Sequence, residues 1–333
     1  MTHVTEVTEH RYTPQEVQKQ SMLEMGSTLL KMLPKNPAAL KKFMVMSPNE
    51  ERYIRPLREY ELPEYRKDMK HCTSNEQYLR PTRYCNSREP AIIAVANELG
   101  AYELSDCEFA EAAYWLVKNK LVLEMLPLDS VSATLKRGTG TCYHLVSLWI
   151  ALCRAAGIKA RYKTFNLQFP EEISRRLVTE LGEGGAMTLD MFGTGGTPEG
   201  EGEAYIDGKW VVAYVAMRPE IYAAAHVPIA RFGEDAVGSL WELIPGTIKR
   251  FESLSLKVGI AMKATMWLAA AEIERFNVFY HTELLPIGRN VIEEAGGIEA
   301  YDRKARNMRE LFSPEEITRE MKEELRQVVE FKE

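Results

Sequence analysis

The chain has 333 residues, of which 45% are hydrophobic and 27% charged, and its formal net charge at pH 7 is −6. This composition provides ample material for a buried core, and the acidic balance argues against a nucleic-acid-binding protein, which usually presents a basic face. The longest apolar run, residues 258–276, is interrupted by Lys263, Glu272 and Glu274, so no membrane-spanning segment is expected.

Five cysteines are present, and no pair of them has the CxxC spacing that is typical of a zinc site. The N-terminus lacks the basic and apolar regions of a signal peptide. An odd number of cysteines in such a chain is typical of a reducing compartment, so a cytoplasmic protein is expected. No metal and no cofactor are predicted, and the sequence leaves the oligomeric state open.

The predicted elements change in kind along the chain. A proline-capped amphipathic helix over residues 13–33 is predicted near the N-terminus. Two further helices, over residues 87–100 and 105–121, precede a third that begins near Cys142. Residues 160–169 alternate as a strand, and residues 203–217 form a hairpin that turns on Asp207-Gly208.

Helices followed by meandering strands indicate an α+β core rather than a repeated βαβ array. Residues 181–203 are rich in glycine and acids and are expected to form a long functional or mobile loop. A final helix is predicted from Ser313. We therefore expect three parts: a helical N-terminal extension over 1–79, the core over 80–240, and a helical C-terminal extension over 241–333.

Cys142 has an unusual position, because it follows the turn "RGTGT" and opens the third helix. The free N–H groups and the dipole at a helix N-terminus favour negative charge. A thiol there is expected to have a lowered pKa and to act as a nucleophilic thiolate, and the same N–H groups could hold an oxyanion. A buried structural cysteine beside a tight turn explains the composition equally well.

The stretch "GTGTC…LWIALCRAAGIKARY" resembles the cysteine motif of the transglutaminase-like superfamily, which has a papain-like fold. The similarity extends over residues 82–235. It implies that the helix bearing Cys142 packs on an antiparallel sheet, and that Cys142 attacks the carbonyl of a peptide, amide or thioester substrate. Gly140 and Thr141 in the turn, and Trp210 and Tyr214 on the strands, are expected to bind substrate.

The chain departs from this family at two positions of the catalytic triad. The family pattern His-Ala-Trp-x-Glu-x-Tyr aligns on Glu203 and Tyr205, and it puts Glu199 at the histidine and Glu201 at the tryptophan. The aspartate expected four residues after the strand tryptophan is Tyr214. A glutamate could replace the histidine as base only if its surroundings raise its pKa.

Another histidine could replace the family histidine as the base. His226, after the hairpin, is the best candidate, whereas His144 is expected to point to a different side of the helix from Cys142. The predicted catalytic residues are therefore Cys142, Glu199, Glu201 and His226.

Three functions remain open from the sequence. The first is acyl transfer or hydrolysis through an acyl-enzyme on Cys142 with atypical acid and base partners. A thioester would suit this site, since its thiolate leaving group needs no proton. The second is a degenerate domain that binds a ligand or serves as a scaffold. The third is a lyase or isomerase in which Glu199 or Glu201 transfers a proton and Cys142 is the acid.

Overall fold

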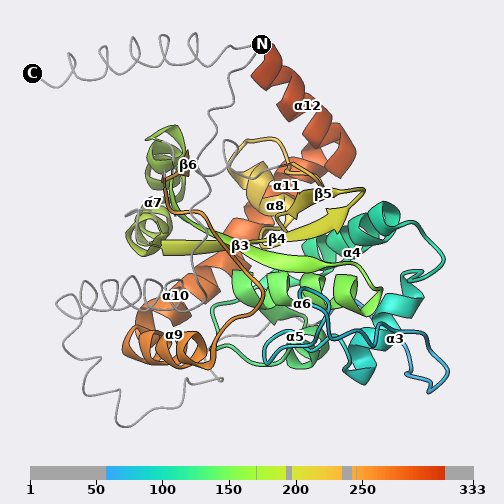
Figure 1. Ribbon diagram of the computed structural model, residues 1–333. Coiled ribbons are helices and arrows are strands. Elements are labelled where there is room, and N and C mark those ends of the chain that lie inside the picture. The colour runs from blue at the N-terminus through green and yellow to red at the C-terminus, as the bar shows by residue number, and fades with distance from the viewer. Residues whose placement is uncertain (1–57, 170, 193–196, 235–241, 245, 312–333) are drawn as a thin grey trace, which may run out of the picture.

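A computed structural model describes residues 58–169, 171–192, 197–234, 242–244 and 246–311 (Figure 1). The amphipathic helix predicted over residues 13–33 and the helix predicted from Ser313 lie outside the described residues. Within the described part of the N-terminal extension, residues 58–79 have no helix or strand. They lie on the core, where the hydroxyl of Tyr60 donates to the carbonyl of Leu135 at 2.6 Å.

An antiparallel sheet with strand order β5-β4-β3-β6 forms the centre of the fold, and β7 also pairs with β3. The turn between β4 and β5 has positive φ at both Asp207 (49°) and Gly208 (78°), as the tight turn predicted from Asp-Gly requires. The strands are β3 (Ala160–Gln168), β4 (Thr197–Ile206), β5 (Lys209–Ala213), β6 (Glu242–Leu243) and β7 (Lys249–Phe251).

Helices precede the strands of the sheet, interrupt them twice along the chain, and follow them. A short parallel pair, β1 (Val122–Leu123) and β2 (Thr139–Gly140), leads into the helix that Cys142 opens. The helices are α3 (Pro90–Glu98), α4 (Asp106–Lys120), α5 (Val131–Arg137), α6 (Cys142–Ala155), α7 (Glu171–Phe192), α8 (Pro219–Ala224), α9 (Leu256–Leu268), α10 (Ala270–Phe279), η2 (Tyr280–Leu284, a π-helical turn), α11 (Leu285–Glu294) and α12 (Ile298–Leu311).

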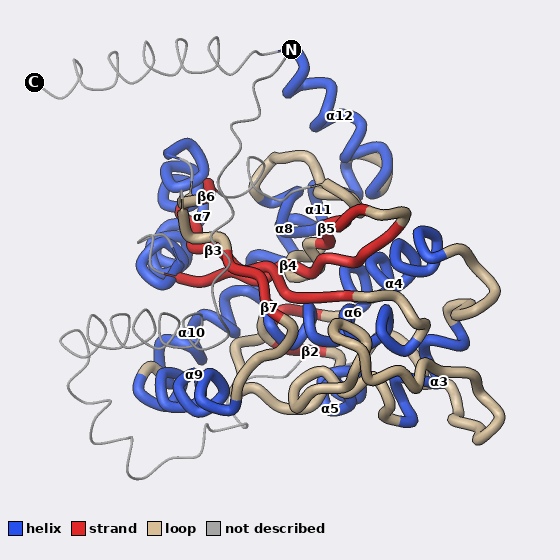
Figure 2. The backbone as a smooth tube through the Cα atoms, in the orientation of Figure 1, coloured by secondary structure: helices blue, strands red, loops and turns tan. Residues whose placement is uncertain are grey.

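The buried helix α6 packs against one face of the sheet (Figure 2). Glycines on β4 permit the close approach, since a Cβ at Gly202 would lie 2.4 Å from the Trp149 ring and one at Gly200 would lie 3.3 Å from the Tyr143 ring. Phe165 on β3 belongs to a second apolar cluster, which also contains Tyr222 of α8. Side chains alternate across a strand, so α6 covers one face of β4 and this second cluster lies over the other.

The predicted α+β core, with the cysteine-bearing helix on an antiparallel sheet, is confirmed. The predicted long loop is wrong over most of its length, because α7 and β4 occupy its described residues. Its glycines serve close contacts instead: a Cβ at Gly185 would lie 1.6 Å from the Leu177 carbonyl oxygen. The region after residue 240 also adds two short strands, β6 and β7, before its helices begin.

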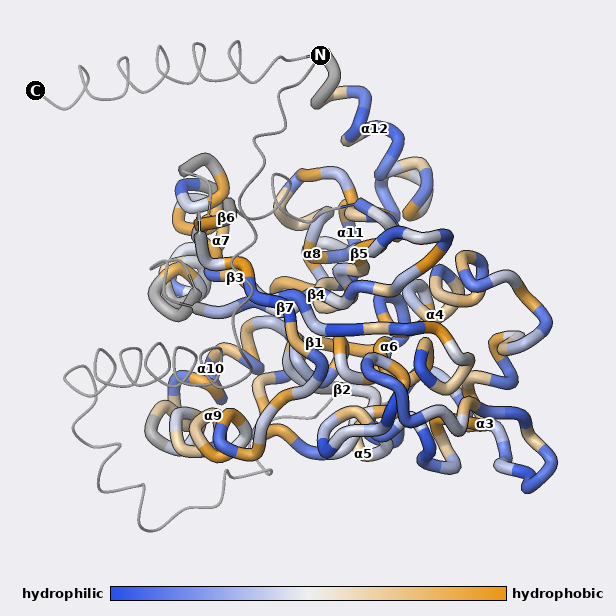
Figure 3. The backbone as a smooth tube through the Cα atoms, in the orientation of Figure 1, coloured by the Kyte–Doolittle hydropathy of each residue, from blue (hydrophilic) through white to orange (hydrophobic). Residues whose placement is uncertain are grey.

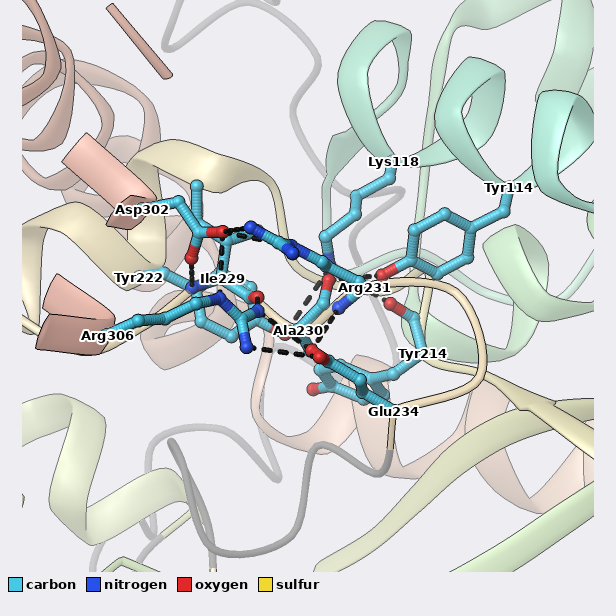
Figure 4. A network of polar contacts seen from close by, with 10 residues as sticks. All are labelled: Tyr114, Lys118, Tyr214, Tyr222, Ile229, Ala230, Arg231, Glu234, Asp302 and Arg306. Atoms are coloured by element: carbon cyan, nitrogen blue, oxygen red, sulfur yellow. Dashed lines mark hydrogen bonds and ion pairs between the residues drawn. The ribbon is translucent and has the colours of Figure 1, made fainter. Parts of the chain in front are cut away.

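The last described helix, α12, consists mostly of hydrophilic residues (Figure 3) and is fixed to the core by ion pairs. Asp302 of this helix accepts hydrogen bonds from Arg231 at 2.6 Å and from Arg306 at 2.9 Å. Arg306 also pairs with Glu234 at 2.8 Å. These contacts hold the segment that follows α8 against α12 (Figure 4).

Candidate active site

Cys142 is the first residue of α6, directly after Thr141, which has an extended conformation (φ −68°, ψ 171°). The peptide before it is fixed by a hydrogen bond from the backbone N–H of Glu124 to the carbonyl of Gly140 at 2.9 Å. Cys142 is partly exposed and contacts the apolar clusters on both faces of the sheet. Its side chain therefore lies at the place where the two sides of the sheet meet.

The carboxylate of Glu199 and the backbone N–H groups of Tyr143 and Gly200 lie beside the sulfur of Cys142, because each of them shifts the pKa of its thiol. Burial of the sulfur, followed by the charge and the hydrogen bond of Glu199, raises the pKa of the thiol well above its usual value. A lowered pKa was expected from the helix N-terminus alone. The carboxylate and the surrounding protein atoms outweigh the helix, so the thiol is protonated at neutral pH.

Glu199 occupies the position at which the family pattern has histidine, and only 5% of its surface is exposed. Burial raises its pKa to about 7, helped by the charge of Glu201 and opposed by hydrogen bonds from the backbone of Gly200 and from the thiol of Cys142. The Gly200 N–H lies 3.1 Å from the carboxylate. A carboxyl group with this pKa can both accept and donate a proton near neutral pH, which is the requirement set out above for replacing an imidazole.

Glu201 is two residues further along β4 and is fully buried. It faces Lys163 across the β3–β4 pair, and their charged groups lie 2.7 Å apart. Glu201 was predicted to be catalytic. Its charge raises the pKa of Glu199. Its place therefore fits a residue that adjusts the base.

Tyr214, at the position where the family has its aspartate, is buried and meets Lys118 of α4 (Figure 4). The amino group of Lys118 lies 3.0 Å from the carbonyl oxygen of Tyr214 and 3.4 Å from the hydroxyl of Tyr222. Burial lowers the pKa of this lysine well below its usual value. Burial and the neighbouring Tyr114 raise the pKa of the Tyr222 phenol most, and the charges of Glu201 and Glu199 raise it further.

The structure does not bring Trp210 to Cys142. Trp210 pairs with Tyr205 near the hairpin turn, and the Arg161 guanidinium lies 3.8 Å from the centre of its ring. Six residues of β4 separate Tyr205 from Glu199, and a strand rises about 3.3 Å per residue, so the two ends are about 20 Å apart. Arg161 already covers this ring, which favours a structural role for Trp210.

His226, the other candidate base, is exposed and lies just after α8. Its φ is 54°, its backbone N–H donates to the carbonyl of Ala223 at 3.1 Å, and the next N–H, of Val227, donates to Tyr222 at 3.0 Å. This pattern is the Schellman motif that ends a helix. The end of α8 therefore accounts for the conformation of His226, and this conformation gives no support to a role in proton transfer.

Gly140 and Thr141, which are predicted to bind substrate, both contact His144. The Thr141 backbone N–H donates to the His144 ring at 3.0 Å, and the ring lies against the α-carbon of Gly140.

Neither Lys163 nor His144 was predicted to support the site. A signal for Lys163 does exist, since charged residues alternate in "ARYKTF" at the positions that face Glu203 and Glu201 across the strand pair.

Two wider features of the described residues bear on function. No group of three or more histidine, cysteine, aspartate or glutamate side chains is arranged there to hold a metal ion. No helix in the same ranges has the length and apolar character needed to cross a membrane.

Comparison with known proteins finds a family model that covers this site. The family model described as "Transglutaminase-like superfamily" matches residues 93–215, the range that contains Cys142, Glu199 and Glu201. A comparison with curated proteins finds no match. A crystal structure described as "a Putative Cysteine Protease from Cytophaga hutchinsonii" is 20% identical, with a TM-score of 0.32, over 54% of this chain and 51% of that one.

The chain thus spans about half the length of that solved protein. The match to the family model supports a fold of the cysteine-based hydrolase and acyltransferase kind for the matched residues. Residues 93–215, which contain Cys142 and its carboxylate neighbours, are thus similar to the transglutaminase-like superfamily.

Proposed function

We propose that this protein transfers acyl groups, from a thioester or an activated amide to water or an amine, through an acyl-enzyme on Cys142. Glu199 is the general base and acid. The observation that carries the proposal is the position of the Cys142 thiol beside the Glu199 carboxyl group, whose pKa is about 7. A nucleophile in contact with a base of suitable pKa is the signature of covalent catalysis.

The first half-reaction follows from this contact. As the sulfur of Cys142 attacks the carbonyl carbon, its proton passes to Glu199, and the carbonyl oxygen becomes negative. Backbone N–H groups in the first turn of α6 point toward this charge, as free N–H groups at a helix N-terminus do. The tetrahedral intermediate then expels its leaving group. A thiolate departs without a proton, whereas an amine takes the proton from Glu199.

The second half-reaction reverses these roles. Water or an amine attacks the acyl-enzyme, and ionised Glu199 accepts its proton. If the leaving thiolate took none, solvent first removes the proton that Glu199 gained. The sulfur then leaves the acyl carbon and recovers a proton from Glu199, which restores the starting thiol.

The pKa of Glu199 favours thioesters over ordinary amides as substrates. A thiolate is a stable leaving group, so the reaction does not depend on strong acid catalysis at the departing atom. Expulsion of an amine from an unactivated amide does depend on it. For an amide, Glu199 must therefore first take the proton of the Cys142 thiol, whose pKa is raised. It must then pass this proton to the departing amine.

The test is turnover of a panel of acyl thioesters and peptide amides, followed by mass spectrometry for an acyl adduct on Cys142. We expect thioester turnover in the wild type, none in Cys142→Ala, and a large loss in Glu199→Gln. The exposed residue Glu103 gives a matched control, Glu103→Gln, which should keep full activity.

The alternatives give different results in the same assay. Binding of panel members without turnover in any variant would support a scaffold. Turnover without an adduct, retained in Cys142→Ala but lost in Glu199→Gln, would support a proton-transfer enzyme and reject acyl transfer.

A further inference from the structure

His144 lies two residues after Cys142, and its imidazole folds back over the start of α6. The ring is buried, with 2% of the residue exposed. Its Nδ1 atom lies 3.0 Å from the backbone nitrogen and 2.8 Å from the Oγ1 of Thr141. Thr141 immediately precedes Cys142, so this ring contacts the peptide that leads into the nucleophile.

Gly140 provides the space for the ring. A Cβ at this position would lie 2.5 Å from the Cβ of His144 and 2.9 Å from its Cγ, closer than such atoms can approach. Any side chain at residue 140 would therefore displace the imidazole. Gly140, Thr141 and His144 form one packed unit at the N-terminus of α6, which explains why a glycine precedes the threonine in "GTC".

The other edge of the ring meets Asp129. The Nε2 atom of His144 lies 3.2 Å from the Oδ1 atom and 3.2 Å from the backbone nitrogen of Asp129. A neutral imidazole has one donor and one acceptor nitrogen. If Nε2 carries the hydrogen, it donates to the carboxylate, and Nδ1 accepts from the backbone N–H of Thr141. The opposite tautomer would keep the hydrogen bond from the backbone N–H of Asp129 to Nε2, but Asp129 is partly exposed. It would leave the N–H of Thr141, which is only 1% exposed, without its acceptor, and it would set the lone pair of Nε2 against the Asp129 carboxylate.

Asp129 is well placed to select the first tautomer. The Arg137 guanidinium lies 2.8 Å from its other carboxylate oxygen. Burial opposes ionisation, but hydrogen bonds from His144 and Arg137 lower the pKa of Asp129 to about 2. The carboxylate is therefore a permanent acceptor at neutral pH, and a carboxylate acceptor fixes which nitrogen of a histidine carries the hydrogen.

We propose that His144 is a positioning residue for Cys142 and that Asp129 sets its tautomer. Through the backbone of Thr141, the pair holds the first turn of α6 so that the sulfur meets Glu199 and the N–H of Gly200. The inference rests on the proposed role of Cys142 as nucleophile. It concerns the geometry of the thiol, however, and can be measured without a substrate.

The measurement is the rate at which iodoacetamide alkylates Cys142, followed by peptide mass mapping from about pH 6 to about pH 10, with exposed Cys107 as internal reference. In His144→Ala, the first turn loosens and the thiol leaves Glu199. Its alkylation at neutral pH should rise about fivefold, the change that corresponds to losing a typical helix cap, and its pH midpoint should fall.

His144→Gln should restore the wild-type profile, since glutamine at this helix position accepts from the N-cap N–H. Asp129→Ala should speed alkylation when residue 144 is histidine but not in the His144→Gln background, where no tautomer needs selecting. Loss of the contact with Arg137 affects both backgrounds equally and cancels in this comparison.

Two results would overturn the proposal. One is an equal effect of Asp129→Ala in both backgrounds, which would make Asp129 merely structural. The other is a His144→Gln profile that differs from the wild type as much as that of His144→Ala does. Circular dichroism of each variant confirms that it is folded. Absence of turnover in the wild type would reject the proposed acyl transfer but would leave the alkylation result intact.

Discussion

Replacing Glu199 with glutamine should change how the stability of the protein depends on pH. In the folded protein, burial and then the charge of Glu201 raise the pKa of Glu199 from 4.5 to about 7. Glutamine keeps nearly the same shape but has no ionised form. The variant therefore removes the cost of burying a negative charge at this position.

The sign and size of the effect follow from the two pKa values. Below pH 4.5, Glu199 holds its proton in both the folded and the unfolded chain, so it has no effect on stability. As the pH rises to 7, the unfolded chain loses the proton first, and the free energy of unfolding falls. The difference of about 2.5 in pKa, at about 1.4 kcal/mol per unit, makes the full loss about 3 kcal/mol.

Urea unfolding of the wild type and of Glu199→Gln at about pH 5 and about pH 8 measures this difference. The stability of the variant relative to the wild type should improve by roughly 2 to 3 kcal/mol from the lower pH to the higher. Effects of packing are common to both pH values and cancel. Glu103→Gln, on the exposed surface, should show no such change. If the relative stability of Glu199→Gln were the same at both pH values, Glu199 would not be a buried carboxyl group with a raised pKa.

Three further predictions concern Glu199, Lys163 and His226. Glu199→Gln should make Cys142 react faster with iodoacetamide at neutral pH, because the variant removes a charge that, together with burial, raises the thiol pKa. Acyl transfer should be lost in the same variant. Slower alkylation would show that the carboxylate promotes the thiolate. Lys163→Met should lower the free energy of unfolding, measured in urea, by about 3 to 5 kcal/mol, because it leaves Glu201 buried without its cation. Adding Glu201→Gln should recover part of this loss, and no recovery would argue against the ion pair. His226→Gly should keep full activity, and its free energy of unfolding should change by less than about 1 kcal/mol, because glycine tolerates the positive φ. A tenfold loss of turnover would support His226 as the base.

The sequence predicted the architecture because local patterns determine it. The turn before Cys142, the apolar residues of α6 and the Asp207-Gly208 hairpin each have a strong local preference, and the structure follows all three. The glycines of residues 182–202 misled the prediction, because glycine serves equally in loops and in close contacts. Only the approach of β4 to α6 shows that Gly202 is needed beneath Trp149.

Much of the candidate site depends on contacts that no local pattern contains. The alignment with the family placed Glu199 at the histidine position, but its contact with Cys142 and its pKa near 7 come from burial and from Glu201. The thiol pKa was expected to fall, because helix position was visible in the sequence and the facing carboxylate was not. Asp129 and His144 are 15 residues apart and meet only because the segment before α5 folds back over α6.

The pH dependence of Cys142 acylation tests the proposed chemistry most directly. An acyl thioester is mixed with excess protein, and the acyl adduct on the Cys142 peptide is measured by mass spectrometry before deacylation. The rate should rise with pH through a midpoint near 7, as Glu199 loses its proton and becomes a base. In Glu199→Gln this step in the profile should vanish and the rate should fall. An acylation rate that is the same in Glu199→Gln, or that rises only near the higher pKa of the thiol, would contradict general-base catalysis by Glu199.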